Sequence, residues 1–479
     1  MNNEVKSRII AGIALISVLS YLLWYAIRPH QLWWDEAVYV LMGKYLFSGG
    51  SFGLWEGARP LVMPLLLGAI WKAGFPVIIT GKIAASLISL CIVAVVFLLA
   101  EEWFGKPQAI LAALFLLTSW PFLFFGSTLM TEHLSMLFSL IAVWLFLKKR
   151  WFFAGFFLGM GFATRFTQVF IAASLGALAL LAWHRKKAST KNLIAACVGL
   201  LLPLFPYLMV NALLYQNPLY PFFYQIEITQ TTSWPYIEPF WFYAKEIILL
   251  TPLYLFALLG FGASFWKAKK EASKYRAIAL ITAVLFTAYS LIGHKEVRFA
   301  TQLLPYLSIL SAHGITIAYS TIQKRGAAKI SFVVVIFIFW IPVADDILLV
   351  RGHQQDYSAY WEYIHEKGNI TDGLWISNPL YMLEGEAKAD RLMYYPRLDS
   401  ERIETLTQEI PQAKTVFISL CDMPCPPNDF SCPAKKKGLL ESLKESAKAI
   451  REIGEEPCRG YIIERQLALP HLDKIPYGK

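Results

Sequence analysis

Charged residues are scarce in this sequence. Asp, Glu, Lys and Arg make up 16% of its 479 residues, whereas apolar residues make up 56%. This composition argues against a soluble multidomain protein, because about a quarter of a typical soluble chain is charged. The apolar residues form blocks long enough to cross a bilayer, and these blocks end near residue 350. We therefore predict a mostly α-helical, polytopic membrane domain over residues 1–350 and a small soluble domain over residues 351–479.

Acidic residues are especially few in the predicted membrane domain. Residues 1–350 contain 27 Lys and Arg but 14 Asp and Glu, which leaves 17 and 20 for residues 351–479. The two regions therefore carry +13 and −3, which sum to the net charge of +10. We assign the basic excess to membrane loops, and so expect no nucleic-acid partner.

The apolar blocks predict about eleven transmembrane helices. The first block is long for a signal peptide, and no small-residue cleavage site follows it. Residues 61–75 are too short and too interrupted to span comfortably, and we expect an interfacial helix there. The predicted spans are residues 9–27, 82–100, 107–126, 131–147, 151–163, 168–183, 192–213, 246–266, 276–292, 299–320 and 329–349.

Basic residues recur in alternate connections between these spans. Examples are Lys148-Lys149-Arg150 and Arg185-Lys186-Lys187. Because cytosolic loops of membrane proteins are enriched in Lys and Arg, the pattern predicts a multi-pass protein of the cell membrane with a cytoplasmic N-terminus. Eleven spans then make the C-terminal domain extracytoplasmic.

The tail alternates apolar runs with helical patterns. Leu374–Ser377, Thr415–Leu420 and Tyr461–Ile463 predict strands, whereas Glu401–Glu409 and Leu439–Ile453 predict helices. A small α/β domain accounts for this alternation. The tail contains no recognisable nucleophile–base pair or phosphate loop.

Cysteine is rare, and four of the six cysteines lie in the tail. Cys91 and Cys197 fall within predicted spans and are expected to be packing residues. An extracytoplasmic tail permits disulfides, and the C-x3-C-x6-C-x25-C spacing is a poor match to a zinc site. We favour two disulfides over a metal site; the candidate residues are Cys421, Cys425, Cys432 and Cys458.

The longest connection in the predicted membrane domain, residues 28–81, contains an unusual aspartate. Only three aspartates occur in the first 350 residues, namely Asp35, Asp345 and Asp346, and the last two follow the final span. Asp35 stands at the start of an amphipathic helical pattern and could be its N-cap. Carboxylates close to hydrocarbon are costly and tend to be functional, which favours a catalytic role for Asp35.

Other charged residues are predicted on the same outer side. Glu132 begins the fourth span, where it either interacts with the helix N-terminus or belongs to a site. Arg165 lies between the fifth and sixth spans, where an arginine needs a carboxylate or a phosphate partner. Glu56 and Arg59 form either a surface ion pair or part of a site.

The densest charged segment is His294-Lys295-Glu296-Val297-Arg298-Phe299, between the ninth and tenth spans. By the predicted topology it is external, against the positive-inside trend. The side chains either extend to the membrane surface or form a phosphate clamp. We favour the clamp, since Arg binds phosphate in a planar fork, Lys adds a point charge and His donates a hydrogen bond.

Together these residues predict an outward-facing carboxylate and an anion-binding group at headgroup depth. Such a site could displace a phosphate-linked group by a hydroxyl or amine that Asp35 deprotonates. The basic residues would stabilise the leaving phosphate.

These segments resemble motifs of the GT-C superfamily of membrane glycosyltransferases, which use polyprenyl-phosphate sugars. Asp35-Glu36-Ala37-x-Tyr39 resembles the catalytic aspartate loop of protein O-mannosyltransferases and of the lipid A aminoarabinose transferase. Arg59-Pro60 resembles the end of that loop, and Glu132 resembles the second acidic position of that family. The segment from His294 to Phe299 is similar to the HKExRF motif of dolichyl-phosphate-mannose-dependent mannosyltransferases.

The resemblance covers approximately residues 9–350 and implies a GT-C fold. It implies inverting transfer of a sugar, with HKExRF favouring mannose, from a polyprenyl (dolichyl) phosphate to a hydroxyl of an extracytoplasmic protein, glycan or glycolipid. Asp35 would be the general base and Glu132 the second acidic residue of the site. No catalytic metal or other cofactor is expected. The implied phosphate ligands are Arg165, His294, Lys295 and Arg298, and the possible substrate contacts are Glu36, Tyr39, Glu56 and Arg59.

Two other classes of protein are alternatives to an enzyme. A transporter or lipid flippase often has two related halves with broken helices at the membrane midplane, and no such halves are recognisable here. In a non-catalytic assembly factor Asp35 would tolerate replacement. Trp33-Trp34-Asp35 is similar to the WWD motif of oligosaccharyltransferases, but that motif belongs to their C-terminal soluble domain. Transfer of a whole oligosaccharide is therefore not expected.

Overall fold

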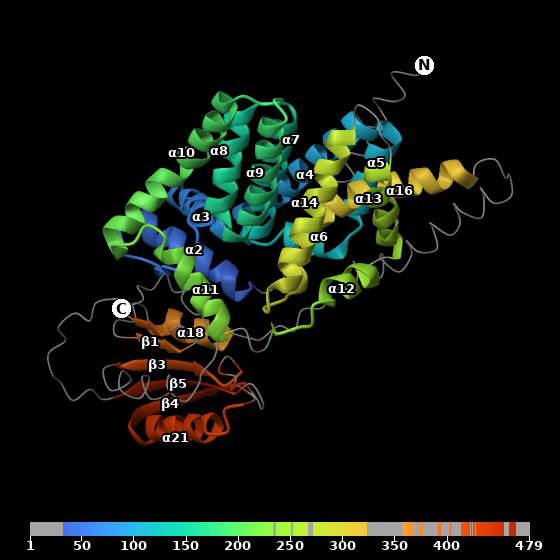
Figure 1. The fold of residues 1–479 in the computed structure, drawn as a ribbon. Coiled ribbons are helices and arrows are strands. Elements are labelled where there is room, and N and C mark those ends of the chain that lie inside the picture. Colours follow the sequence, from blue (N-terminus) through green and yellow to red (C-terminus); the bar gives the residue numbers. More distant parts are fainter. Residues whose placement is uncertain are drawn as a thin grey trace, which may run out of the picture. The chain divides into compact units, whose positions relative to one another are not determined.

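The computed structural model describes residues 32–232, 236–250, 252–266, 272–322 and 358–367 and, further along the chain, 373–376, 391–393, 403, 413–421, 423, 425, 426, 428–454 and 459–465. The chain divides into two compact units, one of Met1–His30 with Glu56–Gly352 and one of Gln31–Trp55 with His353–Lys479 (Figure 1). The helices of the first unit form the helical body. The second unit contains helix α2 (Trp34–Phe47) and the C-terminal tail.

The helical body is built from apolar helices, because a helix satisfies all its backbone hydrogen bonds within one segment and so suits a membrane. Most predicted spans coincide with helices, and the predicted interfacial segment 61–75 contains helix α3. The elements are α3 (Val62–Lys72), α4 (Val77–Phe104), α5 (Lys106–Leu117), α6 (Trp120–Gly126), α7 (Thr131–Leu147), α8 (Trp151–Thr164), η1 (Phe166–Gln168), α9 (Val169–His184), α10 (Thr190–Tyr215), α11 (Tyr220–Thr232), α12 (Phe242–Leu250), η3 (Pro252–Leu255), α13 (Phe256–Trp266), α14 (Ala272–Leu291), α15 (Val297–Ala300) and α16 (Leu304–Ile322).

Fewer of these helices than predicted are long enough to cross a membrane by themselves. Within the described residues, three are long and apolar enough, namely Val77–Phe104, Phe166–His184 and Thr190–Tyr215. A fourth span results if the bent pair α5 and α6 is counted as one. The predicted first and last spans, residues 9–27 and 329–349, lie outside the described residues. The number of eleven spans therefore stays a prediction.

The predicted span 107–126 is not one straight helix. It breaks after Leu117, and α5 and α6 are bent by 67°. At the break, Thr118 and Ser119 donate side-chain hydrogen bonds to carbonyls of the preceding turn, at 2.9 Å and 2.8 Å. Hydroxyls bonded in this way and a nearby proline, here Pro121, are both common causes of helix bends.

Glycine allows two helix pairs to pack backbone to backbone. On α8, a Cβ added at Gly155 would collide with the carbonyl oxygen of Ala196 on α10. A Cβ added at Gly199 on α10 would likewise collide with the carbonyl oxygen of Phe152 on α8. Gly260 on α13 is packed in the same way against α16. Such contacts replace the hydrophobic driving force, which is weak between helices that are surrounded by lipid.

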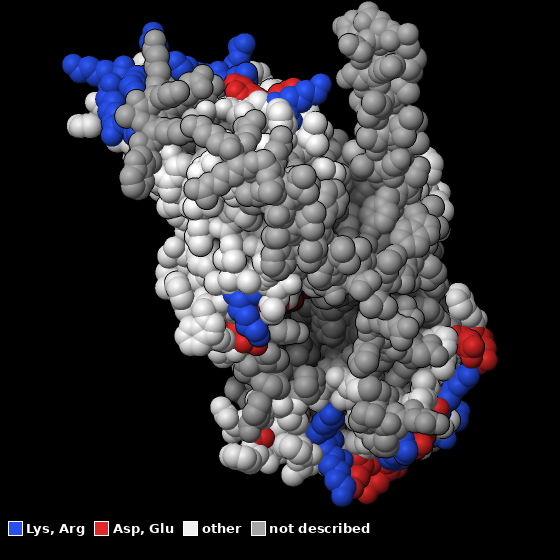
Figure 2. All heavy atoms as spheres, turned by 90° about the vertical axis from the view of Figure 1, so that its right-hand side faces the viewer, with Lys and Arg blue, Asp and Glu red and all other residues white. Residues whose placement is uncertain are grey.

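Charge separates along the helical body. The turns 148–150 and 185–187 are exposed. Figure 2 shows Lys and Arg side chains gathered at one end of the body, next to a largely uncharged band. This separation agrees with a membrane-embedded body, and which end faces the cytosol stays a prediction.

The tail contains a five-stranded sheet in the order β2-β1-β3-β5-β4 (Figure 1). β1 pairs in parallel with β2 and β3, whereas β5 pairs antiparallel with β3 and β4. β1, β3 and β5 coincide with the three predicted strands, which confirms them. The bounds in the tail are α18 (Ser358–Lys367), β1 (Gly373–Ile376), β2 (Arg391–Met393), β3 (Thr415–Ser419), α21 (Cys432–Glu445), β4 (Ala447–Ile453) and β5 (Gly460–Arg465).

The predicted helix Leu439–Ile453 is wrong in its second half. α21 ends at Glu445, and Ala447–Ile453 forms the edge strand β4. Strand β4 pairs with β5 from Ala447 opposite Arg465 to Ile453 opposite Gly460. Pairing with β5 thus overrides the local helical pattern. The periodicity of a single segment does not reveal such a pairing. Most of the predicted helix Glu401–Glu409 lies outside the described residues.

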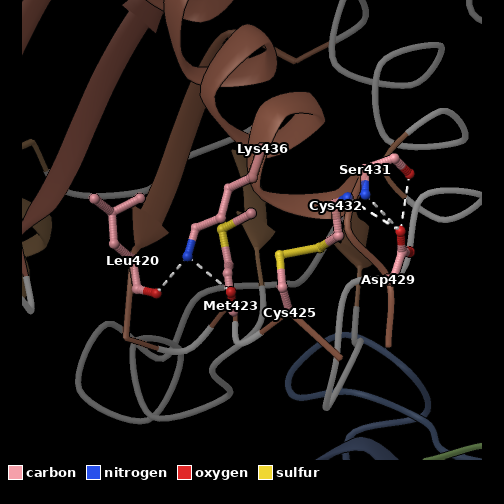
Figure 3. The surroundings of a disulfide bond; sticks show 7 residues. All are labelled: Leu420, Met423, Cys425, Asp429, Ser431, Cys432 and Lys436. Atoms are coloured by element: carbon pink, nitrogen blue, oxygen red, sulfur yellow. Dashed lines mark hydrogen bonds between the residues drawn. A yellow bond between two sulfur atoms is a disulfide. The ribbon is translucent and has the colours of Figure 1, made fainter. Parts of the chain in front are cut away.

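A disulfide fixes the start of α21, as Figure 3 shows. It joins Cys425 to Cys432, and Cys421 is disulfide-bonded as well. The carboxylate of Asp429 accepts hydrogen bonds from the backbone of Cys432 and from the backbone and hydroxyl of Ser431. The preference for disulfides is therefore confirmed at Cys425 and Cys432, whereas Cys458 lies outside the described residues.

Candidate active site

Glu132 lies in the first turn of α7 and is completely buried. Its Oε1 accepts a hydrogen bond from Nη1 of Arg165 at 3.0 Å, and the same Nη1 lies 3.1 Å from Oγ1 of Thr131. Arg165 has extended backbone between α8 and the 3₁₀ turn η1, so the break between these helices presents its side chain to α7. The anionic partner predicted for Arg165 is thus a carboxylate in this structure.

Arg298 approaches the same carboxylate from α15. Its Nε lies 3.9 Å from Oε1 of Glu132, and its Nη2 lies 2.7 Å from Oε1 of Glu296. Nε2 of His294 lies 2.7 Å from that oxygen of Glu296. The structure therefore brings together Glu132, Arg165, His294 and Arg298, four of the residues predicted from the sequence.

Phe299 supports both guanidinium groups. The Cζ atoms of Arg165 and Arg298 lie 5.0 Å and 5.3 Å from the centroid of its ring. A guanidinium at this distance from an aromatic ring is attracted to the ring electrons. The side chains of the two arginines are 15% and 14% exposed, so both are partly accessible while they pack on Phe299.

The carboxyl of Glu296 is held in its ionised form. Burial alone would raise its pKa, but the charge of Arg298 and the hydrogen bonds from His294 and Arg298 outweigh burial and lower the pKa below its ordinary value. Glu296 therefore contributes a negative charge that orients Arg298 and His294.

Lys295 has different neighbours from the arginines. Its ammonium group donates to the carbonyl oxygens of Glu238 and Ile292, each at 2.7 Å, and its backbone N–H donates to Tyr236 at 2.9 Å. Burial lowers the pKa of Lys295, and the charge of Glu238 opposes this effect. These bonds tie the loop after α14 to the segment before α12, which favours a structural role for Lys295 beside the predicted phosphate role.

Asp35, Glu36 and Tyr39 belong to helix α2, in the other compact unit. The N-cap of α2 is Trp33, and Oε2 of Glu36 accepts the backbone hydrogen bond of Trp33 at 2.7 Å. The alternative that Asp35 is the N-cap is therefore wrong, and Glu36 performs the capping. Glu36 and Tyr39 are buried, as are all residues from Glu36 to Lys44, so burial extends beyond the single apolar face predicted for this helix.

Glu56 and Arg59 form an ion pair, with Nε 2.9 Å from Oε1, and both side chains are largely buried. Within the described ranges, no group of three or more His, Cys, Asp or Glu side chains could hold a metal ion.

Three uncharged polar residues beside Glu132 were not predicted. Ser135, Gln168 and Gln302 are almost completely buried and hydrogen-bonded to one another or to the backbone of Glu132. Glutamine carries no charge that contrasts with an apolar helix, so charge patterning does not detect it. Its sequence signal is an amide within an otherwise apolar block.

Comparison with known proteins gives a family and a fold. The model of the Alg9-like mannosyltransferase family matches residues 10–366. No curated protein sequence matches the chain. ArnT from Cupriavidus metallidurans, solved bound to undecaprenyl phosphate, is similar in structure with a TM-score of 0.63 at 12% identity, over 94% of this chain and 97% of that one. AglB, an oligosaccharyltransferase from Archaeoglobus fulgidus solved with an inhibitory peptide and a dolichol-phosphate, has a TM-score of 0.62 at 13% identity, over 95% and 75% of the chains.

Proposed function

The chain belongs to the Alg9-like mannosyltransferase family and is a membrane glycosyltransferase of the GT-C type, and from this premise we propose that it transfers mannose from a polyprenyl (dolichyl) phosphate to a hydroxyl group. The acceptor is an extracytoplasmic protein, glycan or glycolipid. ArnT was solved with undecaprenyl phosphate and AglB with a dolichol-phosphate, which supports a polyprenyl-phosphate donor here.

The observation that carries the proposal is the pair of arginines on Phe299. Arg165 and Arg298 come from separate parts of the chain, yet both pack on one ring and face the carboxylate of Glu132. Planar guanidinium groups bind phosphate oxygens in a fork, so two of them side by side suit the phosphate of a lipid carrier. His294, which contacts Glu296 beside Arg298, adds a hydrogen-bond donor.

In the proposed reaction Asp35 accepts the proton of the acceptor hydroxyl. The hydroxyl oxygen forms a bond to the anomeric carbon of the sugar, and the bond from that carbon to the phosphate oxygen breaks with inversion. The electron pair of the broken bond goes to the phosphate, whose growing charge Arg165 and Arg298 stabilise. Glu132 holds both arginines and is the second acidic residue of the site.

The remaining predicted residues take supporting roles in this proposal. Glu36 and Tyr39 support helix α2 beside Asp35, and the pair of Glu56 and Arg59 fixes the chain after that helix. Lys295 fixes the segment that carries His294 and Arg298. The N-terminus is cytoplasmic and the tail extracytoplasmic, so donor and acceptor meet outside the cytosol.

The test is transfer from labelled polyprenyl-phosphate mannose in membranes that contain the wild-type protein or Asp35→Asn. A lost general base lowers the rate by about 100-fold or more at equal protein level. Glu445→Gln, an exposed carboxylate at the end of α21, is the matched control and keeps the wild-type rate. Equal rates in Asp35→Asn and wild type would remove Asp35 from the mechanism. Movement of intact labelled donor across the membrane, without transfer, would support a flippase instead.

A further inference from the structure

A second set of polar residues accompanies the charged residues of the candidate active site. Each member lies three or four residues, about one helical turn, after a charged residue. The pairs are Glu132 with Ser135, Arg165 with Gln168, and Arg298 with Gln302. We call Ser135, Gln168 and Gln302 the amide layer.

Hydrogen bonds join the members of the amide layer to one another and to the backbone of Glu132. Nε2 of Gln302 donates to the carbonyl oxygen of Glu132 at 2.8 Å. Nε2 of Gln168 donates to Oε1 of Gln302 at 3.0 Å and to Oγ of Ser135 at 3.1 Å. The hydroxyl of Ser135 in turn donates to the carbonyl oxygen of Glu132 at 2.9 Å. The layer therefore joins α7, the turn η1 and the segment between α15 and α16.

Because the amide layer is buried, its hydrogen bonds favour one relative position of the three segments. Gln168 and Gln302 are each 1% exposed and Ser135 is fully buried. A buried amide that loses its partner cannot turn to water, so shifting any of the three segments leaves polar atoms unpaired. The spacing of the three segments is thereby restricted by directional bonds.

The charged residues alone would not set this spacing. Both arginines approach the same oxygen of Glu132, and attraction between charges has little directional preference. Glu296 and the ring of Phe299 hold the guanidinium groups locally, but they do not tie α7 to the two segments that carry the arginines. The amide layer supplies that restraint one turn along each segment.

We propose that Gln168 and Gln302 are positioning residues, which hold Arg165 and Arg298 at the separation needed to bind one phosphate together. This inference rests on the proposed function, since it assigns the arginines to the donor phosphate. Gln302 acts on the carbonyl oxygen of Glu132, and Gln168 connects Gln302 with the segment of Arg165.

The first experiment compares Gln302→Met and Gln168→Met with wild type. Methionine keeps length and volume but removes the amide bonds, so the packing is retained. Loss of the bonds that orient metal ligands lowers metal affinity by about 10- to 100-fold, and we expect a loss of that order for the phosphate ligands here. The KM for labelled polyprenyl-phosphate mannose should rise by this factor, with a smaller change in kcat. The affinity for polyprenyl phosphate alone, measured by ligand-induced thermal stabilisation, should fall by the same factor. Gln108→Met, on α5, is the matched control and keeps both values.

The double variant Gln168→Met/Gln302→Met tests whether the two residues act as a unit. Because the two amides bond to each other, the double variant should lose about as much affinity for polyprenyl phosphate as the worse single variant. Independent residues would instead give additive losses of affinity. Additive losses of affinity would show that the two residues do not act as a unit, and an unchanged affinity for polyprenyl phosphate in all three variants would overturn the inference.

The variant Gln302→Glu provides a readout that a role in packing would not produce. A carboxyl group donates a hydrogen bond only when protonated. We therefore divide the affinity of Gln302→Glu for polyprenyl-phosphate mannose by that of wild type. This ratio should increase as the pH falls, whereas the same ratio for Gln302→Met should not change with pH. A flat ratio for both variants contradicts the inference.

These outcomes separate the inference from the proposed function. If wild type binds polyprenyl phosphate but transfers no sugar, the proposed function fails while the affinities still test the amide layer. If wild type transfers sugar and all glutamine variants equal Gln108→Met, the amide layer has no positioning role and the proposed function stands. A wild type that neither binds nor transfers contradicts both.

Discussion

Within the described residues, the tail buries most of its large apolar side chains, with Phe430 and Ile450 as exceptions, whereas the helical body keeps many of them on its surface. In the tail, Val416, Ile418 and Ile463 form an apolar core with α21. On α10 of the body, Leu213 is 74% exposed and Phe205 65% exposed. In lipid, apolar surface gives no driving force for packing, so the body must be held by other contacts.

Among the described residues, largely buried ion pairs occur in the body, whereas the ion pairs of the tail are exposed. Glu132 and Arg165 of the body have side chains 1% and 15% exposed, whereas Glu464 and Lys367 of the tail have side chains 28% and 51% exposed. Removing one partner of a buried pair is expensive, but exposed pairs contribute little. Buried ion pairs are therefore structural elements of the body, whereas the described pairs of the tail, like Lys148 with Glu102 on the body surface, contribute little.

The largest expected effect breaks the buried pair. Arg165→Met leaves Glu132 buried beside a single, more distant arginine, and removal of one partner costs about 3–5 kcal/mol. Thermal unfolding in detergent should show this loss, and transfer should be abolished because one phosphate ligand is gone.

The double variant Glu132→Gln/Arg165→Met sharpens that result. It removes the unpaired charge, so most of the stability should return while transfer stays absent. A double variant as unstable as Arg165→Met would mean that the side chain of Arg165 stabilises by packing and not by its charge.

An intermediate effect concerns the glycine contacts. Gly155→Ala places a methyl group against the carbonyl oxygen of Ala196, so α8 and α10 must separate. Strain of this kind costs about 1–3 kcal/mol. Gly176→Ala on α9 is the control, since nothing lies within 4 Å of its added Cβ, and alanine favours a helix over glycine. Equal unfolding temperatures of the two variants would show that α8 and α10 can move apart freely.

The smallest effect lies in the tail, at Glu464. The hydrogen bonds from Lys367 and Tyr363 lower the pKa of Glu464 below its ordinary value. The folded state therefore binds fewer protons than the unfolded state. The contribution of Glu464 to the free energy of unfolding is present above the unfolded pKa and is lost as the pH falls through the folded pKa. Glu464→Gln should remove a pH-dependent contribution of less than about 1 kcal/mol, measured by unfolding between neutral and acidic pH. An unchanged pH profile would mean that the pair is irrelevant to stability.

The sequence predicts the helical elements of the body well, because long apolar blocks have few alternatives in a membrane. It does not predict the bend at Thr118 and Ser119, since both residues also occur in straight helices. The strand β4 was missed because Ala447–Ile453 becomes a strand only through pairing with β5.

The candidate site divides in a similar way. Arg165 and Glu132 stand out in the sequence, since charge is rare in an apolar block. That they pair with each other depends on how α7 packs beside α8, which local patterns do not encode. Gln168 and Gln302 escape notice for the same reason that they suit the site, because they carry hydrogen-bonding groups without charge.

The bonds of Lys295 and His294 connect the candidate site to an exposed residue, Ile237. His294 pairs in a β-bridge with Ile237, and the ammonium and backbone of Lys295 bind the same short segment, so residues 236–238 and 293–295 move together. Ile237 is 66% exposed although its partner His294 is largely buried. A fluorescent or spin label attached at position 237 would therefore follow any movement of the segment that carries His294, from an exposed side chain outside the proposed chemistry.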